Sequence, residues 1–177
     1  MATHISLLRG INVSGQKKVD MKKLKQLYES LGFKEVQTYI QSGNVIFEHA
    51  ATKIPELLIK IQNKIMQYFG FEVFVVIRTK HEFQKLIQNN PFAGKDESRI
   101  YVTFLSEKPK DVLMEEIEKV KGKEEEFFLS GKEIYFFCPH GYGRTKLSNN
   151  FFERKLKVAA TTRNWRTVST LLSLAQK

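Results

Sequence analysis

The chain has 177 residues, of which 42% are hydrophobic and 27% are charged, a balance typical of a globular protein. Its single cysteine, Cys138, excludes an internal disulfide and a cysteine-rich zinc site. No stretch approaches the roughly 18 unbroken apolar residues of a membrane helix. Residues 1–9 also lack the basic flank and apolar run of a signal peptide. We therefore expect a cytoplasmic protein with no membrane partner.

The formal net charge of +10 is unevenly distributed along the chain. Residues 1–35 carry an excess of four positive charges and residues 140–166 an excess of six, while residues 36–139 are close to neutral. If the fold brings the two basic segments together, they form one positive surface that attracts phosphate-bearing partners. The alternative is two separate solvated faces that serve solubility.

The first half of the chain predicts the element order strand, helix, strand, strand, helix, strand. Asp20 is a candidate helix cap, and Gly32 and Gly70 are candidate helix stops. Apolar periodicity and turn residues place the strands at 5–11, 36–41, 45–47 and 71–77, and the helices at 21–31 and 55–69. This order is the ferredoxin-like pattern, in which two helices pack on one face of an antiparallel sheet.

The second half repeats the pattern after a connecting helix near 80–90. Thr79 and Glu82 have the spacing of a capping box at the start of that helix, and residues 92–98 form a linker. We expect Leu113, Ile117 and Val120 to point inward from the next helix. The later elements are predicted as strands at 100–105, 127–129 and 134–137, and helices at 109–120, 148–158 and 164–175.

Two hairpins support an internal duplication. Tyr39–Phe47 and Phe127–Tyr135 both contain a Ser-Gly turn between apolar strands, and each lies roughly 35 residues after the first strand of its half. We therefore predict an α+β fold of two tandem ferredoxin-like (βαββαβ-type) subdomains, with antiparallel sheets and helices on one face. The predicted domains are 1–79 and 98–177, with a connecting helix and linker at 80–97.

The sequence contains no motif for a specific reaction. It has no phosphate-binding P-loop, no dinucleotide fingerprint and no G-x-S-x-G elbow. The four histidines lack metal-ligand spacing. Cys138 and His140 could form a thiol–imidazole pair, but a buried cysteine beside a surface histidine is the favoured interpretation. No catalytic residue, metal or cofactor is predicted.

Three polar segments are candidates for anion binding. The first is residues 8–18, where Arg9, Asn12 and Lys17 belong to a glycine-rich loop before a helix. Its structural alternative is that the glycines only permit a turn. The second is residues 141–148, in which Lys146 and the helix cap Ser148 could hold a phosphate. Its alternative is an ordinary connector.

The third segment, residues 161–167, has two threonines that are expected to begin a helix with cations in its first turn. Positive groups at a helix N-terminus oppose the helix dipole, at a cost of roughly 0.3–1 kcal/mol each. An anion held by Thr162, Arg163 and free N–H groups reverses that effect. The alternative is that the arginines bond to carboxylates or stack on Trp165.

Four stretches of this sequence resemble a bacterial family of uncharacterised proteins, the domain of unknown function 1697. They are Leu8–Val13, Tyr39–Val45, Lys146–Leu147 with Phe152–Glu153, and Thr161–Val168. The resemblance spans nearly the whole chain and implies two ferredoxin-like subdomains. It implies no established activity, substrate or catalytic residue.

The leading functional hypothesis is therefore binding of a phosphate-containing ligand, with nucleic acid as the first candidate and a phosphorylated small molecule as another. The rival is an enzyme that acts on a small anionic metabolite in a cleft between the subdomains. A third hypothesis is an adaptor that binds protein partners through an exposed sheet edge. The sequence does not determine the oligomeric state. The candidate ligand-binding residues are Arg9, Asn12, Lys17, Ser42, Asn44, Lys146, Ser148, Thr162, Arg163, Asn164 and Trp165.

Overall fold

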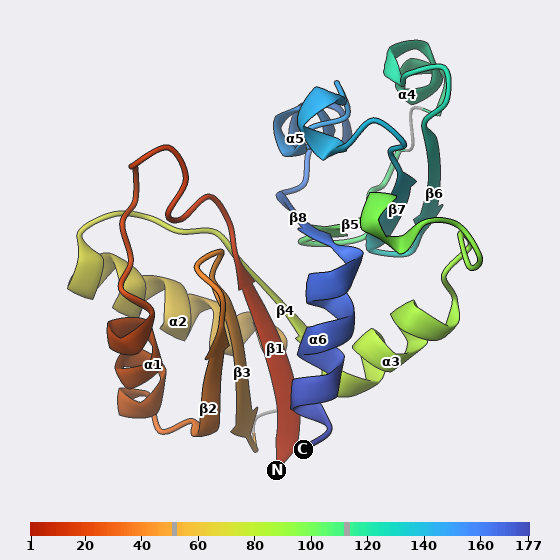
Figure 1. Cartoon of the computed structure of the whole chain (residues 1–177). Helices are drawn as coiled ribbons and strands as arrows, with labels where there is room; N and C mark the ends of the chain where they lie inside the picture. The colour runs from red at the N-terminus through yellow and green to blue at the C-terminus, as the bar shows by residue number, and fades with distance from the viewer. Residues whose placement is uncertain (51–52, 112–113) are drawn as a thin grey trace. The chain divides into compact units, whose positions relative to one another are not determined.

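The computed structural model describes residues 1–50, 53–111 and 114–177 (Figure 1). The chain divides into two compact units, each of which is described by itself. The first unit contains Met1–Lys85 together with Leu171–Lys177, and the second contains Leu86–Thr170.

The first unit contains a four-stranded antiparallel sheet in the order β2-β3-β1-β4. With two helices between the strands, this is the ferredoxin-like topology. The six elements of the fold are β1 (Ala2–Leu8), α1 (Met21–Ser30), β2 (Lys34–Tyr39), β3 (Asn44–His49), α2 (Ile54–Phe69) and β4 (Val75–Thr79).

The second unit repeats the same order of elements and the same sheet topology, β6-β7-β5-β8, again antiparallel. The predicted α+β fold of two ferredoxin-like halves is therefore confirmed. The elements are β5 (Ile100–Leu105), α4 (Met114–Val120), β6 (Glu126–Ser130), β7 (Glu133–Phe137), α5 (Asn149–Leu156) and β8 (Ala160–Asn164). The chain also contains α3 (Lys80–Gln88), α6 (Trp165–Ala175) and two short 3-10 helices, Glu97–Arg99 and Tyr142–Arg144.

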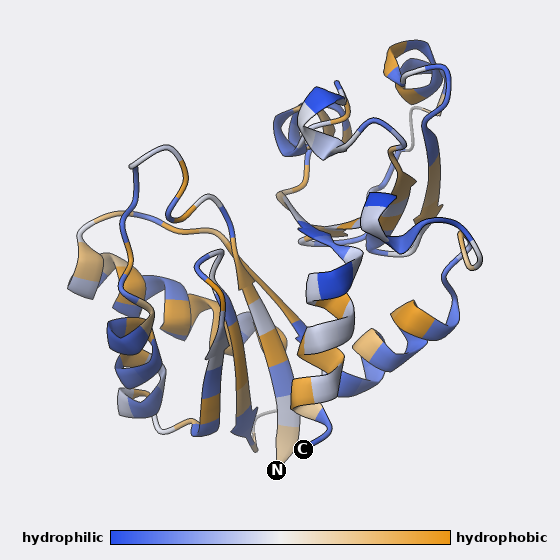
Figure 2. Cartoon of the chain, in the orientation of Figure 1, coloured by the Kyte–Doolittle hydropathy of each residue, from blue (hydrophilic) through white to orange (hydrophobic). Residues whose placement is uncertain are grey.

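The core of the first unit lies between its sheet and the helices α1 and α2. Buried side chains from both helices pack against apolar residues of β1, β3 and β4, and Figure 2 shows these strands as largely apolar. Burial of each Leu or Ile side chain contributes about 1.5–3 kcal/mol. The contributing residues include Leu24, Leu27, Leu57, Ile61, Ile65, Val45, Phe47, Val75 and Ile77.

The core of the second unit is richer in aromatic residues. Phe136 of β7 and Phe152 of α5 lie with their ring centroids 5.4 Å apart, and Phe151 packs edge-on against Phe152. Ile117 of α4 and Leu147 belong to the same buried cluster. Each unit therefore has an apolar core of its own.

The helix boundaries follow the predicted caps. The capping box of α3 is confirmed, because Thr79 N donates to Glu82 Oε2 at 2.7 Å and Glu82 N donates to Thr79 Oγ1 at 3.2 Å. Ser148 caps α5, as predicted, by accepting from Phe151 N at 3.2 Å. The helix expected at 109–120 is observed as α4 from Met114 to Val120, and residues 109–111 are not helical. Leu113 lies outside the described residues.

The observed strand boundaries differ from the predicted ones, with the largest consequences at the end of β1 and the start of β4. β1 ends at Leu8 instead of residue 11, because Gly10 and Asn12 have positive φ and turn the chain away. The strand expected at 71–77 is β4, which begins only at Val75. The apolar residues before Val75 therefore form a loop, and one of them, Phe74, is exposed.

Candidate ligand-binding surface

The loop between β1 and α1 is an ordered structure with several left-handed residues. Asn12 N donates to Lys17 O at 3.1 Å, and Gln16 N donates to Val13 O at 2.9 Å. Three residues other than glycine, namely Asn12, Ser14 and Lys17, have φ between 44° and 54°. Each such conformation costs of order 1 kcal/mol or more, so the surrounding contacts must hold the loop in place.

The Asn12 side chain supplies three of those contacts. Its side-chain amide donates to Val19 O at 3.0 Å and to Gln41 O at 2.9 Å, and its oxygen accepts from Val19 N at 2.8 Å. The side chain thus ties the β1–α1 loop to the turn between β2 and β3. Asn12, predicted as a ligand-binding residue, acts here as a brace for the loop.

The β2–β3 turn is fixed by two other predicted residues. The buried Asn44 amide donates to Tyr39 O at 3.0 Å and to Ser42 Oγ at 2.9 Å. Gly43 lies between them with φ of 79°, and its carbonyl accepts from Leu8 N at 2.8 Å. A Cβ on Gly43 would lie 2.7 Å from Leu8 Cβ, so only glycine fits.

A third loop joins the same end of the sheet. Arg9 N donates to Phe74 O at 2.9 Å, and Lys17 Nζ donates to Glu72 O at 2.7 Å. We call the combined surface of residues 9–18, 40–42 and 72–74 the three-loop surface. Hydrogen bonds connect all three of its segments.

The three-loop surface combines cations with exposed apolar side chains. Val13 is 58% exposed, and Ile40 and Phe74 are each 49% exposed. Lys17 and Lys18 are exposed on the first loop, and Arg9 is partly exposed. Sequence reasoning identified Arg9 and Lys17 and missed the apolar members. A valine inside a glycine-rich polar loop was the available signal.

The N-terminus of α1, which follows this loop, already holds an anion from its own chain. Asp20 accepts from Lys22 N at 2.8 Å and from Lys23 N at 3.1 Å. These amides lower the pKa of the Asp20 carboxyl below its usual value. Any ligand phosphate must therefore be held by the loop cations instead of by this helix end.

The third predicted segment lies in the second unit, and its expected secondary structure is wrong. Thr161, Thr162 and Arg163 belong to strand β8, and α6 begins at Trp165. The β-branched threonines suit a strand. Asn164 is the residue that caps α6, because its side-chain oxygen accepts from Thr167 N at 2.8 Å.

Arg163 is only 7% exposed. Its Nη1 donates to Thr161 Oγ1 at 2.8 Å and to Thr162 O at 2.9 Å. Burial lowers the pKa of the guanidinium to about 10. Trp165 is buried as well, so neither side chain presents itself openly to solvent.

Thr162 is the centre of a polar network in the second unit. Its hydroxyl donates to Asn149 Oδ1 at 2.7 Å and lies 2.7 Å from Thr103 Oγ1 and 3.0 Å from Tyr142 Oη. The ring of Tyr142 also packs on Tyr101, with centroids 5.2 Å apart. The network joins the 141–148 segment to the sheet and saturates the Thr162 hydroxyl.

The remaining predicted groups of the second unit differ in exposure. Lys146 and Asn164 are exposed, whereas Ser148 is partly buried at the cap of α5. Cys138 is buried, and burial raises the pKa of its thiol to about 12. His140 Nε2 lies 2.5 Å from Glu124 Oε2 at the surface, within hydrogen-bond distance. A catalytic thiol has no support in this geometry.

Three surface hollows lie within single units, and their linings contain none of the eleven candidate residues. Residues 1–50, 53–111 and 114–177 contain no group of three His, Cys, Asp or Glu side chains placed to hold a metal ion. Among the same residues, no helix has both the length and the apolar character needed to span a membrane.

The fold and its loops define a protein of two tandem ferredoxin-like units with braced, basic loops. Residues 1–135 match a family described as "Protein of unknown function (DUF1697)". The chain therefore belongs to this family, which confirms the family predicted from the sequence. No curated protein matches the chain.

Among solved structures, the chain is similar to the conserved bacterial protein SP0830 from Streptococcus pneumoniae. The TM-score is 0.74 and the sequence identity is 24%, and the match covers 98% of each chain. At this identity the similarity establishes the fold alone.

Proposed function

We propose that the three-loop surface binds a phosphate-containing ligand, and that this ligand is a single-stranded segment of nucleic acid. The observation that carries the proposal is the combination of Arg9, Lys17 and Lys18 with exposed Val13, Ile40 and Phe74. Single-stranded nucleic acid needs both kinds of contact, because cations neutralise its phosphates while aromatic and apolar side chains contact its bases.

The charge of the first unit supports this proposal. The unit contains 14 Lys and Arg residues against seven Asp and Glu residues, a formal charge of +7. The second unit contains 15 against 12, a formal charge of +3. A polyanion is therefore attracted more strongly to the unit that carries the three-loop surface.

The sheet face opposite α1 and α2 is buried, which favours the loops as the binding surface. Ferredoxin-like RNA-binding domains commonly stack bases on the face of the sheet that the helices leave open. In the first unit that face carries Ile5, Leu7 and Val76, which are all buried. The sheet therefore offers no aromatic platform there, and exposed Phe74 provides the alternative.

The internal hydrogen bonds weigh against the rival metabolite enzyme. The amides of Asn12 and Asn44 and the hydroxyl of Ser42 already bond to other groups of the first unit. Groups used in this way are poor candidates for positioning a small substrate. They instead hold the loop backbone rigid, which lowers the entropy lost on binding.

The test is fluorescence anisotropy with labelled single-stranded DNA and RNA between about 50 and 200 mM salt. We expect affinity to fall steeply with salt. Lys18→Gln should reduce the slope of log binding constant against log salt concentration by about 0.7 in magnitude. Phe74→Ala should weaken binding about tenfold.

Lys25→Gln is the matched control, because Lys25 is an exposed lysine of α1 outside the surface and the change removes the same charge. Equal weakening by Lys18→Gln and Lys25→Gln would show diffuse attraction to the whole unit. The three-loop surface would then be wrong as the binding site.

A further inference from the structure

Strand β6 is the edge of the second sheet. It pairs with β7 over five consecutive residue pairs in one unbroken register, from Glu126 with Phe137 to Ser130 with Glu133. Among the described residues, β6 has a strand neighbour on one side alone. Alternate residues of such a strand direct N–H and C=O groups away from the sheet, where another strand can bind them.

The corresponding edge strand of the first sheet is protected. Its strand β2 has a register shift between Lys34 and Gln37, and Glu35 within the shift has φ of 47°. A bulge and a lysine are two of the devices that prevent an edge from pairing with another chain. β6 has neither of them.

The side chains of β6 are apolar for an edge strand. Phe128 is 51% exposed, and Phe127 and Leu129 are only partly buried. Phe128 pairs with Tyr135 and therefore lies on the sheet face opposite to the helices, whereas its two neighbours point toward the core cluster. The exposed phenylalanine stands at the middle of the strand.

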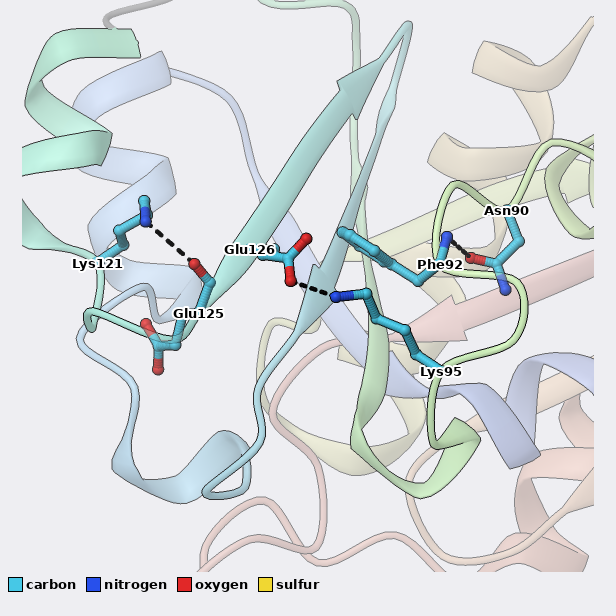
Figure 3. Close-up of polar contacts among 6 residues, drawn as sticks. All are labelled: Asn90, Phe92, Lys95, Lys121, Glu125 and Glu126. Carbon is cyan, nitrogen blue, oxygen red and sulfur yellow. Dashed lines mark hydrogen bonds and ion pairs between the residues drawn. The ribbon is translucent and has the colours of Figure 1, made fainter.

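The N-terminal end of β6 is held in place by its own unit. Figure 3 shows the ion pair between Glu126 and Lys95, whose ammonium group also lies 4.5 Å from the centroid of the Phe137 ring. Lys121 Nζ donates to Glu125 O at 3.1 Å just before the strand (Figure 3). Phe92 N donates to Asn90 Oδ1 at 2.9 Å in the loop that leads to Lys95 (Figure 3). The ion pair and the Lys121 bond therefore anchor the start of the strand to other segments of its own unit.

We propose that β6 pairs antiparallel with β6 of a second copy of this chain, about a two-fold axis at Phe128. In that register Phe128 faces Phe128 of the other copy, and Phe127 faces Leu129. Continued four residues to either side of Phe128, the same register places Glu124 of one copy opposite Lys132 of the other. The pairing is thus self-complementary in the apolar residues of the strand and in the charged residues that flank it, because Glu124 precedes β6 and Lys132 lies in the β6–β7 turn.

Charge selects the antiparallel direction. Residues Glu124, Glu125 and Glu126 are consecutive carboxylates at one end of the strand. Parallel pairing would bring the two acidic triplets side by side, and like charges opposite one another are destabilising. Antiparallel pairing separates the triplets and brings each Glu124 to a Lys132.

The dimer should be weak. A five-residue edge buries less than the roughly 800 Å² per partner of a standard stable interface. We therefore expect dissociation in the micromolar range, with the monomer dominant at low concentration.

The test is sedimentation velocity of the full chain over about 1 to 500 µM, a range chosen to bracket a micromolar dissociation constant. Wild type should show a concentration-dependent monomer–dimer equilibrium. Phe128→Lys should raise the dissociation constant about tenfold or more, because it places two cations at the axis. Glu124→Lys and Lys132→Glu should each weaken the dimer on their own.

An equal mixture of Glu124→Lys and Lys132→Glu chains should restore association, because both cross-strand pairs are then complementary again. His140→Ala is the control, since it removes the internal partner of Glu124 without touching the strand. A wild type that stays monomeric at the highest concentration, or a dimer indifferent to Phe128→Lys, would overturn the proposal. Circular dichroism of each variant confirms that it is folded.

Discussion

The side-chain amide of Asn12 donates to the carbonyl oxygen of Gln41 at 2.9 Å, although 29 positions separate the two residues in sequence. This bond joins the β1–α1 loop to the β2–β3 turn. Both partners lie in stretches, Leu8–Val13 and Tyr39–Val45, that resemble the family. The motifs therefore build one braced structure at the end of the first sheet, and the exposed groups of that structure are the proposed ligand contacts.

Replacement of Asn12 by alanine should loosen this structure. The change removes three side-chain hydrogen bonds and leaves the amide and carbonyl of Val19 without that partner. We expect a loss of about 2–3 kcal/mol in the free energy of unfolding. Urea denaturation measures it, with the exposed Asn63→Ala on α2 as the control expected to change stability by less than about 0.5 kcal/mol. Equal stability of the two variants would contradict the brace.

Gly43→Ala tests the close approach of the turn to β1. Alanine at this position has both a strained positive φ and a Cβ within 2.7 Å of Leu8 Cβ. Gly32→Ala has a similar φ, of 85°, with no atom within 4 Å of its new Cβ. The strain should cost about 1–2 kcal/mol in both variants. Only Gly43→Ala adds a steric clash to this strain. Thermal unfolding should therefore give Gly43→Ala a clearly lower Tm than Gly32→Ala.

The burial of His4 should make the folded chain less stable at acid pH. The side chain is 2% exposed and stacks on Phe47 with ring centroids 5.3 Å apart. Neither ring nitrogen has a hydrogen-bond partner among the described residues, although the nearby His49 backbone favours the protonated ring. Burial is the larger effect and lowers the pKa of His4 below 6.5, with His49 opposing the charge and Glu82 favouring it.

The sign of the pH effect follows from that shift. The unfolded chain binds the proton of His4 more readily than the folded chain, so stability rises with pH and is lost as pH falls below about 6.5. Urea denaturation between pH 5 and pH 8 measures the effect. His4→Leu should flatten the profile in this range, whereas the exposed His81→Gln should leave it unchanged. An unaltered profile in His4→Leu would assign the pH effect to other groups.

Cys138 should be an inert thiol. It is buried in the second core, and burial raises its pKa to about 12. Because the thiolate is the reactive form, a disulfide reagent at pH 8 should react slowly with the folded chain and rapidly in denaturant. Rapid reaction of the folded chain would contradict the burial of this residue.

The fold was predictable because local signals and the global topology agree. Gly32 and Gly70 end regions of helical periodicity, and Thr79 with Glu82 forms the capping box that the spacing predicts. The repeated Ser-Gly hairpins correctly indicated two halves of the same topology. Strand ends were less predictable, since an apolar run such as residues 71–77 does not show where pairing begins.

The candidate surface was only partly predictable. Arg9 and Lys17 were recognisable as cations in a glycine-rich loop. The exposure of Phe74 was not predictable, because it depends on β4 beginning at Val75 instead of residue 71. The sequence of Thr161–Arg163 predicts a helix start, which is wrong because threonine suits strands as well as helix caps. Asn164, which accepts from Thr167 N, is the true cap of α6.

The most direct test of the central claim is a two-dimensional amide NMR titration of the ¹⁵N-labelled chain with a short single-stranded oligonucleotide. We predict that the shifted resonances belong to residues 9–18, 40–42 and 72–74, and that Lys18→Gln with Phe74→Ala suppresses the shifts. Saturable shifts confined to the second unit, or no shifts at low salt, would contradict binding at the three-loop surface.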